Sequence, residues 1–388
     1  MLIIVAVVLA PGCRGRHETN AFPAQYIGKP WKNVGDTPAA HDGDTEAVSG
    51  LSEVLAGREP PPRPGRPLNV LVMSGGGKYG AFTAGILNGW TASGTRPTFD
   101  VATGVSSGAL IATLAFLGPK YDEKMAFFFT TLQRSTVYQF QILRGLCSRM
   151  GIMTAEPLEI IVRGVINDEF MCDLQAAHSE GRRLYVGTCE VQTNRPVIWD
   201  IGAIASSSRP DARELLVKIL TAACTPPAVV KPTEIVVEIN GVNYREFHTD
   251  GGNMLQAFVR TPAEIPAGST FWALSAGKYY RDPPEGPPRI LSLFGGAVSN
   301  SLYALFRSDL MKLYALCAVT RSNFRLIALP QDFKVSSSAF AFDPAELERL
   351  YWVGYQMTAN GGQWRNAPPD TLPGEATPPR TGTQFISP

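Results

Sequence analysis

The sequence predicts an α/β fold, and three observations carry this prediction. Short apolar segments at residues 68–73 and 101–103 have the composition of buried strands. Each is followed by a glycine-rich turn and then by a helical apolar pattern, so strand, turn and helix recur in succession. The chain has 388 residues, of which 45% are apolar and 18% charged, and therefore holds ample material for a core.

Charge and cysteine usage exclude several classes of protein. The 35 basic and 34 acidic residues leave a formal charge of +1, which argues against nucleic-acid binding and against a polybasic clamp on anionic lipid. A zinc site or a disulfide scaffold is not expected, because no two cysteines form a Cys-x-x-Cys pair. The six cysteines are dispersed along the chain: Cys13, Cys147, Cys172, Cys189, Cys224 and Cys317.

The first glycine-rich turn is SGGGKYG, at residues 74–80. A turn between a strand and a helix presents backbone N–H groups to a negatively charged ligand. Gly75, Gly77 and Gly80 also satisfy the G-x-G-x-x-G fingerprint of dinucleotide-binding proteins. That fingerprint requires an acidic residue at the end of the next strand, whereas Asp100 precedes its strand. An oxidoreductase remains an alternative here, as does a tight turn without a ligand.

The second turn follows the strand at residues 101–103 and contains a G-x-S-x-G pattern. Gly104 and Gly108 relieve crowding in a strained strand-to-helix turn. Such a turn lifts Ser106 clear of the backbone at a helix N-terminus, where the helix dipole favours an oxyanion. Ser107 follows, and its N–H is a candidate oxyanion donor. Ser106 is therefore the candidate nucleophile.

A nucleophilic serine needs a base, and the histidines are weak candidates. Only His178 and His248 follow Ser106 in the chain. His178 lies at the polar end of an expected helix and is interpreted as a surface residue. His248 lies near the end of an expected strand.

Asp250 is the stronger candidate for the base. Asn240-Gly241 between two apolar segments predicts a β-hairpin, and Asp250 leaves its second strand into a turn formed by Gly251 and Gly252. A carboxylate bonded to a serine hydroxyl can act as general base in a site dry enough to raise its proton affinity. The alternative interpretation is that Asp250 only caps the following turn.

The order of glycine loop, G-x-S-x-G and Asp-Gly-Gly resembles the patatin-like phospholipase family. Residues 183–188 resemble the family's mid-domain strand, and residues 220–229 resemble its proline-containing segment. The resemblance covers roughly residues 68–278. It implies a three-layer α/β/α sandwich with a mostly parallel central sheet, and a serine lipid acyl hydrolase that cleaves carboxylic esters of lipids or phospholipids through an acyl-enzyme.

The resemblance also implies roles for individual residues. Ser106 would be the nucleophile and Asp250 the base of a Ser-Asp dyad, without metal or cofactor. The oxyanion hole would be formed by Gly75, Gly76 and Gly77. The chain departs from the family where an Arg or Lys usually precedes the last glycine of the loop: Tyr79 occupies that place and Lys78 lies one position earlier.

The segment between residues 122 and 166 is rich in aromatic and apolar side chains. It is interpreted either as helical core or as the lining of an acyl pocket or lid. The members singled out are Met125, Phe127, Phe128, Phe129, Leu132, Tyr138 and Phe140.

The N-terminus resembles a bacterial lipoprotein signal, because the apolar run at residues 2–10 is too short to span a bilayer and Cys13 follows it. Cys13 would then carry a lipid and anchor the protein to a membrane surface of the cell envelope, on its periplasmic or outer-membrane side. No basic residue precedes the run, and Pro11 is unusual for such a signal. A buried strand with an ordinary Cys, and a cytoplasmic protein, is the alternative.

These features predict five regions. They are a signal peptide (1–13), a Pro-rich linker (14–67), a hydrolase domain (68–278), a C-terminal helical extension of that domain (279–365) and a disordered tail (366–388). A non-catalytic envelope lipoprotein that keeps the fold as a binding module remains the main alternative to an enzyme. The oligomeric state is not specified by the sequence.

Overall fold

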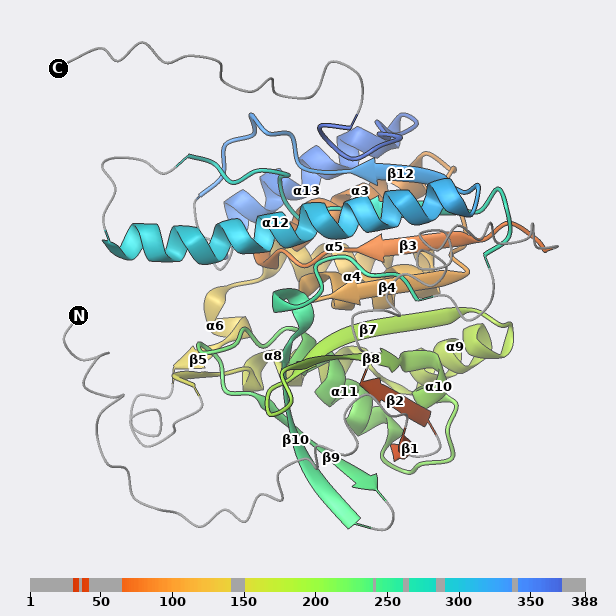
Figure 1. Ribbon diagram of the computed structural model, residues 1–388, viewed down its shortest axis with the longest axis vertical. Helices are drawn as coiled ribbons and strands as arrows, with labels where there is room; N and C mark the ends of the chain where they lie inside the picture. The colour runs from red at the N-terminus through yellow and green to blue at the C-terminus, as the bar shows by residue number, and fades with distance from the viewer. Residues whose placement is uncertain are drawn as a thin grey trace.

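The computed structural model describes residues 31–34, 37–41, 65–140, 151–239, 242–260, 265–283, 290–336 and 341–371. Within these residues the fold is organised around one ten-stranded sheet in the order β1-β2-β8-β7-β4-β3-β11-β12 (Figure 1). Off this path, β10 pairs with β7, and β9 pairs with β10. Its strands are β1 (Trp31–Val34), β2 (Thr37–His41), β3 (Asn69–Met73), β4 (Val101–Val105), β7 (Arg183–Glu190), β8 (Arg195–Asp200), β9 (Thr233–Ile239), β10 (Val242–Asp250), β11 (Thr270–Leu274) and β12 (Asn323–Ile327).

The centre of the sheet is parallel. Strands β7, β4, β3, β11 and β12 all pair in parallel, while β8 and β10 pair antiparallel with β7. The carboxyl ends of parallel strands lie at one edge, so the turns that follow β3 and β4 are neighbours. The expected α/β fold with a mostly parallel sheet is confirmed.

Helices cover both faces of the sheet. Alternate residues of β3 divide between two apolar clusters: Val70 and Val72 pack with α12, and Leu71 and Met73 pack with the helices of the other face. Figure 1 shows α12 crossing in front of the sheet, with α3 and α13 behind. The helices are α3 (Gly80–Ala92), α4 (Ser107–Leu117), α5 (Asp122–Thr131), α6 (Arg134–Val137), α8 (Glu156–Val165), α9 (Asp168–Ser179), α10 (Ile201–Ala205), α11 (Ala212–Ala223), α12 (Ile290–Val319) and α13 (Pro344–Ala359).

Short elements complete the described chain. They are the 3-10 turns η3 (Gly77–Tyr79), η4 (Pro119–Tyr121) and η5 (Gly251–Asn253), and a small separate sheet of β5 (Gln139–Phe140) and β6 (Met153–Thr154).

Helix α13 packs backbone to backbone against α3, far from it in sequence. A Cβ added at Gly85 of α3 would lie 1.9 Å from the Tyr351 carbonyl oxygen. A Cβ at Gly354 of α13 would lie 2.0 Å from the Phe82 carbonyl oxygen. Only glycine permits so close an approach of two backbones. The two helices therefore pack tightly through their glycine-bearing faces. The helix that follows the glycine loop is therefore held by the C-terminal part of the chain.

The observed elements agree with those expected from short sequence patterns. The expected strands at 68–73, 101–103 and 183–188 correspond to β3, β4 and β7, and the expected hairpin to β9 and β10, with Val242 opposite Ile239. Residues 279–365 contribute not only α12 and α13 but also β12, which extends the sheet next to β11.

The predictions for the leader and the tail fall outside the described residues. Cys13 and the signal peptide lie there, as do most of the linker and residues 372–388 of the tail. Among the described helices, none combines the length and the apolar character needed to cross a bilayer.

Candidate active site

Ser106 occupies a strained turn between β4 and α4. Its φ of 53° and ψ of −137° lie in a region that non-glycine residues adopt at a cost of about 1–3 kcal/mol, usually at functional sites. The turn is possible because its neighbours lack side chains: a Cβ at Gly108 would lie 2.4 Å from the Ser74 carbonyl oxygen, and a Cβ at Gly104 would lie 2.4 Å from the Gly108 carbonyl oxygen. The G-x-S-x-G spacing therefore follows from the packing of β4, α4 and the glycine loop.

Asp250 is brought to Ser106 by the sheet. The residue ends β10, where it pairs with Thr188 of β7, and β7 is the parallel neighbour of β4. Its backbone N–H donates to the Thr225 carbonyl oxygen at 2.8 Å, and its Oδ1 accepts from the Gly252 N–H at 2.8 Å. Gly251 is needed because a Cβ there would lie 2.7 Å from the Gly187 carbonyl oxygen. Asp250 thus caps the following turn and also faces the serine.

The environment of Asp250 favours a carboxyl group that holds its proton more tightly than usual. Burial raises its pKa from 3.8 to about 6, although hydrogen bonds from the Ser106 hydroxyl and the Gly252 N–H act in the opposite direction. A base with a pKa near the working pH is ionised at neutral pH and yet takes up a proton readily.

This pKa predicts the pH dependence of any reaction in which Asp250 is the base. Only the ionised carboxylate accepts a proton, so kcat/KM should rise with pH through about 6 and reach a plateau above it. Measurement of kcat/KM on a soluble ester between about pH 4.5 and 8.5 checks this. A profile without an inflection in the acid limb would contradict the assignment of Asp250 as base.

The glycine loop lies directly over Ser106. A Cβ at Gly75 would lie 2.9 Å from the Ser106 Cβ, and a Cβ at Gly76 would lie 1.9 Å from the Ala276 carbonyl oxygen. Gly77 has a φ of 57°, in the left-handed region. Within the described chain, no acceptor pairs with the N–H groups of these three glycines. The loop therefore offers backbone donors beside the serine, as an oxyanion requires.

Lys78 and Tyr79 occupy the part of the loop that departs from the pattern of the family that the sequence resembles. The Lys78 side chain is fully buried, and its Nζ donates to Glu346 Oε2 at 2.9 Å and to the Ser336 carbonyl oxygen at 2.8 Å. Tyr79 instead lines a cavity beside the loop, and burial raises its pKa. The cation of the loop thus points into the protein, while a neutral phenol faces the site.

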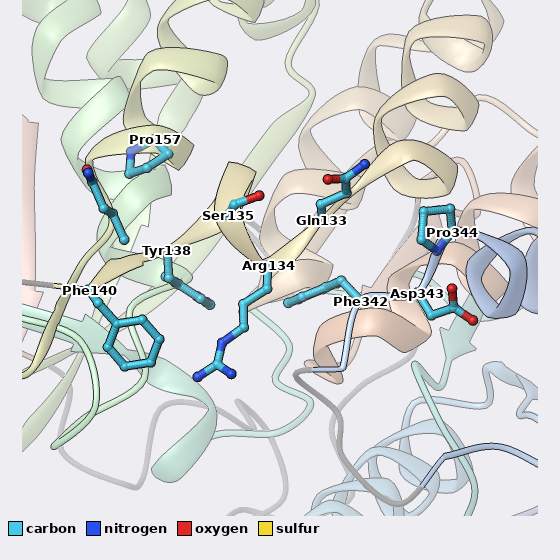
Figure 2. Close-up of a pocket in the computed structure, with 10 residues that line it drawn as sticks. Gln133, Arg134, Ser135, Tyr138, Phe140, Pro157, Phe342, Asp343 and Pro344 are labelled. Atoms are coloured by element: carbon cyan, nitrogen blue, oxygen red, sulfur yellow. The ribbon is translucent and has the colours of Figure 1, made fainter.

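Two cavities are lined by residues that contact the glycine loop or the segments around Asp250. The first, here named the glycine-loop cavity, has a volume of about 1160 Å³. It is lined by Ser74, Gly75, Gly76 and Tyr79 of the loop together with residues 256, 275–278, 281–283, 295, 298, 299, 302, 303, 306 and 334–336. The second, the Tyr138 cavity, has a volume of about 840 Å³ and is shown in Figure 2. Both are large enough for parts of a lipid.

Tyr138 connects the second cavity to the dyad. Its hydroxyl donates to the Cys224 carbonyl oxygen at 2.7 Å, next to Thr225, which holds the Asp250 backbone. Burial, the thiol of Cys224 and the carboxylate of Asp250 together raise the pKa of Tyr138. In Figure 2, Arg134 and Phe342 extend toward the space next to Phe140, and the Arg134 guanidinium lies 5.0 Å from the Phe140 ring centre.

The aromatic segment between residues 122 and 166 serves both as core and as surface. Met125, Phe129, Leu132 and Tyr138 are buried in the large apolar cluster, which matches the interpretation as core. Phe128 is partly buried, and Phe127 and Phe140 are exposed. Phe140 lines the Tyr138 cavity, so part of the segment borders a cavity.

The histidines are not brought to the serine. His248 is fully buried, its Nδ1 lies 3.0 Å from Thr188 Oγ1 and its Nε2 lies 2.9 Å from Glu246 Oε2. His178 lies at the end of α9, partly buried with its Nδ1 4.0 Å from Asp200 Oδ1. Neither can serve Ser106 as a base.

Asp100 lies at the opposite end of the sheet from the glycine loop. Its carboxylate accepts the Asn69 N–H at 2.7 Å and pairs with Arg66, at the amino ends of β3 and β4. An acidic residue that contacts a dinucleotide ribose lies at the carboxyl end of its strand, so the arrangement does not fit dinucleotide binding.

One further residue of the site was not expected from the sequence. Gln256 donates from Nε2 to the Gly252 carbonyl oxygen, and its Oε1 would lie 3.7 Å from a Cβ at Gly75. It therefore bridges the turn after Asp250 and the glycine loop. A glutamine in a loop carries no signal of such a role in the sequence.

The comparisons with known proteins decide the family. The sequence model of the patatin-like phospholipases matches residues 71–265, half of the chain, and this range includes the loop, Ser106 and Asp250. The chain belongs to the patatin-like phospholipase family. A search of curated proteins gave no match.

Among solved structures, this patatin-like phospholipase is similar to the crystal structure of VipD from Legionella pneumophila. The likeness has a TM-score of 0.31 at 11% sequence identity, and it covers 76% of this chain and 66% of the VipD chain. The chain thus spans slightly less than two thirds of that neighbour.

Proposed function

We propose that this patatin-like phospholipase is a lipid acyl hydrolase in which Ser106 and Asp250 form a catalytic dyad. The observation that carries the proposal is the strained Ser106 next to a carboxylate whose pKa is raised to about 6. Family membership supports a lipid ester as the substrate class. In this proposal the glycine-loop cavity and the Tyr138 cavity take its acyl and alcohol parts.

In the proposed reaction Ser106 Oγ attacks the ester carbonyl carbon while Asp250 takes the hydroxyl proton. The N–H groups of Gly75, Gly76 and Gly77 hold the oxyanion of the tetrahedral intermediate, and one good donor of this kind is worth about 3 kcal/mol. The intermediate collapses to an acyl-Ser106, and Asp250 gives its proton to the departing alcohol. Water then attacks the acyl group as Asp250 takes a proton, and this proton returns to Ser106 as the fatty acid leaves.

A fluorophosphonate probe tests the nucleophile. We expect the probe to label the wild-type protein at Ser106, because the reagent phosphonylates activated serines, and Ser106→Ala to remain unlabelled. Ser107→Ala is the matched control, since it removes a neighbouring buried hydroxyl and keeps the backbone. Mass spectrometry of the labelled peptide identifies the site. A protein that ignores the probe and cleaves no lipid ester would instead be a binding module.

We further propose that the protein is tethered to the cell envelope through a lipid on Cys13. The proposal rests on the sequence alone, that is, on the apolar run before Cys13 and the proline-rich segment after it. A near-neutral chain cannot depend on charge to stay near lipid, so an anchor would serve an enzyme of this kind. Mass spectrometry of the mature protein should find Cys13 as a lipidated first residue; an unmodified Cys13 still joined to Met1 would contradict it.

A further inference from the structure

We propose that Arg281 and Lys334 form a subsite for the headgroup of an anionic phospholipid, next to the glycine loop. The inference rests on the proposed hydrolase function and deepens it, because it names the class of lipid that the site selects. Both residues line the glycine-loop cavity, and both lie beyond the range matched by the family.

The location of the cavity suits the alcohol side of an ester. Its lining includes Gly75 and Gly76, which lie over Ser106, and Gln256, which contacts the turn after Asp250. A group held in this cavity therefore lies within reach of a carbonyl placed between Ser106 and the loop donors.

The charge of the cavity is positive and partly uncompensated. Its lining contains the basic residues Lys278, Arg281 and Lys334 and one acidic residue, Asp282. Lys278 Nζ lies 2.8 Å and 2.7 Å from the two carboxylate oxygens of Asp282, so these two charges cancel. Among the described residues, no carboxylate pairs with Arg281 or Lys334, and two positive charges remain in a chain of net charge +1.

The helix facing the cavity makes room for Arg281. A Cβ at Gly296 of α12 would lie 2.7 Å from Arg281 Nη1, so the guanidinium rests where any other residue would displace it. Glycine within a helix costs about 1 kcal/mol relative to alanine. A guanidinium binds phosphate oxygens in pairs and is the side chain best suited to a phosphodiester.

The same cavity also has an apolar wall. Val298, Leu302 and Phe306 of α12 line the cavity together with the charged residues. A ligand that uses both the basic and the apolar lining carries an anionic group and a hydrocarbon part on one molecule. A choline or ethanolamine headgroup would bring a cation toward Arg281 and Lys334, and the carboxylate of Asp282 is already occupied by Lys278. The cavity therefore favours headgroups with a net negative charge over zwitterionic ones.

The subsite also supplies the positive charge that the glycine loop itself does not present to the cavity. Lys78 is buried against Glu346 and cannot meet a ligand, and the phenol of Tyr79 faces the cavity. Arg281 and Lys334 supply positive charge to the same cavity from other segments.

Short-chain lipids test the subsite without a membrane surface. The probes are dihexanoylphosphatidylglycerol, dihexanoylphosphatidylcholine and dihexanoylglycerol, each as a monomer in solution. We expect wild-type kcat/KM to be about tenfold higher for the phosphatidylglycerol than for the phosphatidylcholine. In R281Q/K334Q we expect the ratio of kcat/KM for phosphatidylglycerol over dihexanoylglycerol to fall by about tenfold or more, mainly through KM.

The control removes equivalent charge elsewhere. Arg195 and Lys231 are exposed and do not line the cavity. R195Q/K231Q should therefore leave kcat/KM for phosphatidylglycerol unchanged relative to phosphatidylcholine and relative to dihexanoylglycerol. An equal loss of kcat/KM on all three lipids in R281Q/K334Q would show a structural effect and overturn the proposal. An unchanged ratio would overturn it as well.

A binding measurement separates this inference from the proposed hydrolase. In Ser106→Ala, calorimetry should detect dihexanoylphosphatidylglycerol, and R281Q/K334Q in that background should weaken its binding by about tenfold. Loss of binding in the charge variant would support the subsite even if the wild-type protein cleaved no ester. Competition by inorganic phosphate alone at equal affinity would identify a free-phosphate site instead and overturn the lipid assignment. Absence of lipid binding would also overturn it.

Discussion

Asp250→Asn should abolish lipid ester hydrolysis and at the same time stabilise the folded protein. The loss of kcat should be about 10⁴-fold or more, because a base that acts as a unit with its nucleophile cannot be replaced by a neighbouring group. The described histidines cannot substitute, since His248 lies in the core against Thr188 and Glu246. Kinetics on a soluble ester and on a phospholipid measure the loss.

The gain in stability follows from the raised pKa. The folded state holds the Asp250 proton up to about pH 6, whereas the unfolded chain releases it near 3.8, so ionisation of Asp250 destabilises the fold as pH rises between these values. The full cost above about pH 6 is on the order of 3 kcal/mol. Asparagine carries no charge and can still accept the Gly252 N–H, so it avoids this cost.

Denaturant unfolding at two pH values tests this gain. Asp250→Asn should be more stable than the wild type at about pH 8 and nearly equal to it at about pH 4. Ser106→Ala is the control, because it removes activity without removing the charge. A variant that is inactive but no more stable at about pH 8 would show that Asp250 is not desolvated in the folded protein.

The sequence singled out those parts of the candidate site that depend on neighbours in the chain. The positions of Ser106 and Asp250 follow from local motifs, because a strand, a glycine turn and a helix fix the backbone within a few residues. Parallel pairing of β4 with β7 and antiparallel pairing of β7 with β10 then bring the two motifs together.

The sequence could not predict which way the loop cation points. Lys78 is buried because Glu346 and Ser336 meet it there, and both come from segments more than 250 residues later. The same holds for Arg281 and Lys334, whose shared cavity depends on how α12 crosses the sheet. Such contacts have no periodicity and no short motif.

Lys78→Met should destabilise the protein by about 3–5 kcal/mol at neutral pH. Removal of one partner of a buried ion pair leaves the other charge uncompensated, which costs more than the pair itself contributes. Glu346 would be that charge: burial alone would raise its pKa, but hydrogen bonds from the Ser336 N–H and from Lys78 outweigh burial and hold the pKa below its ordinary value. The pair therefore stabilises the fold above about pH 4.5 and less as pH falls below it.

A second variant distinguishes the ion pair from simple packing. Lys78→Met combined with Glu346→Leu removes both charges and should recover most of the lost stability, because apolar residues of similar size can replace a buried pair. Chemical denaturation of the wild type, both single variants and the double variant gives the coupling energy. A double variant as unstable as the sum of the two single ones would mean that the charges do not interact.

The pair should also matter for catalysis, because it joins the glycine loop to α13. Helix α13 is locked on α3 through Gly85 and Gly354, and Lys78 extends this attachment into the loop that lies over Ser106. The double variant should regain stability but lose the ion pair that fixes the position of the loop. We therefore expect kcat to fall while KM changes little, since the oxyanion donors act in the transition state. A restored fold with unchanged kcat would show instead that α3 alone positions the loop.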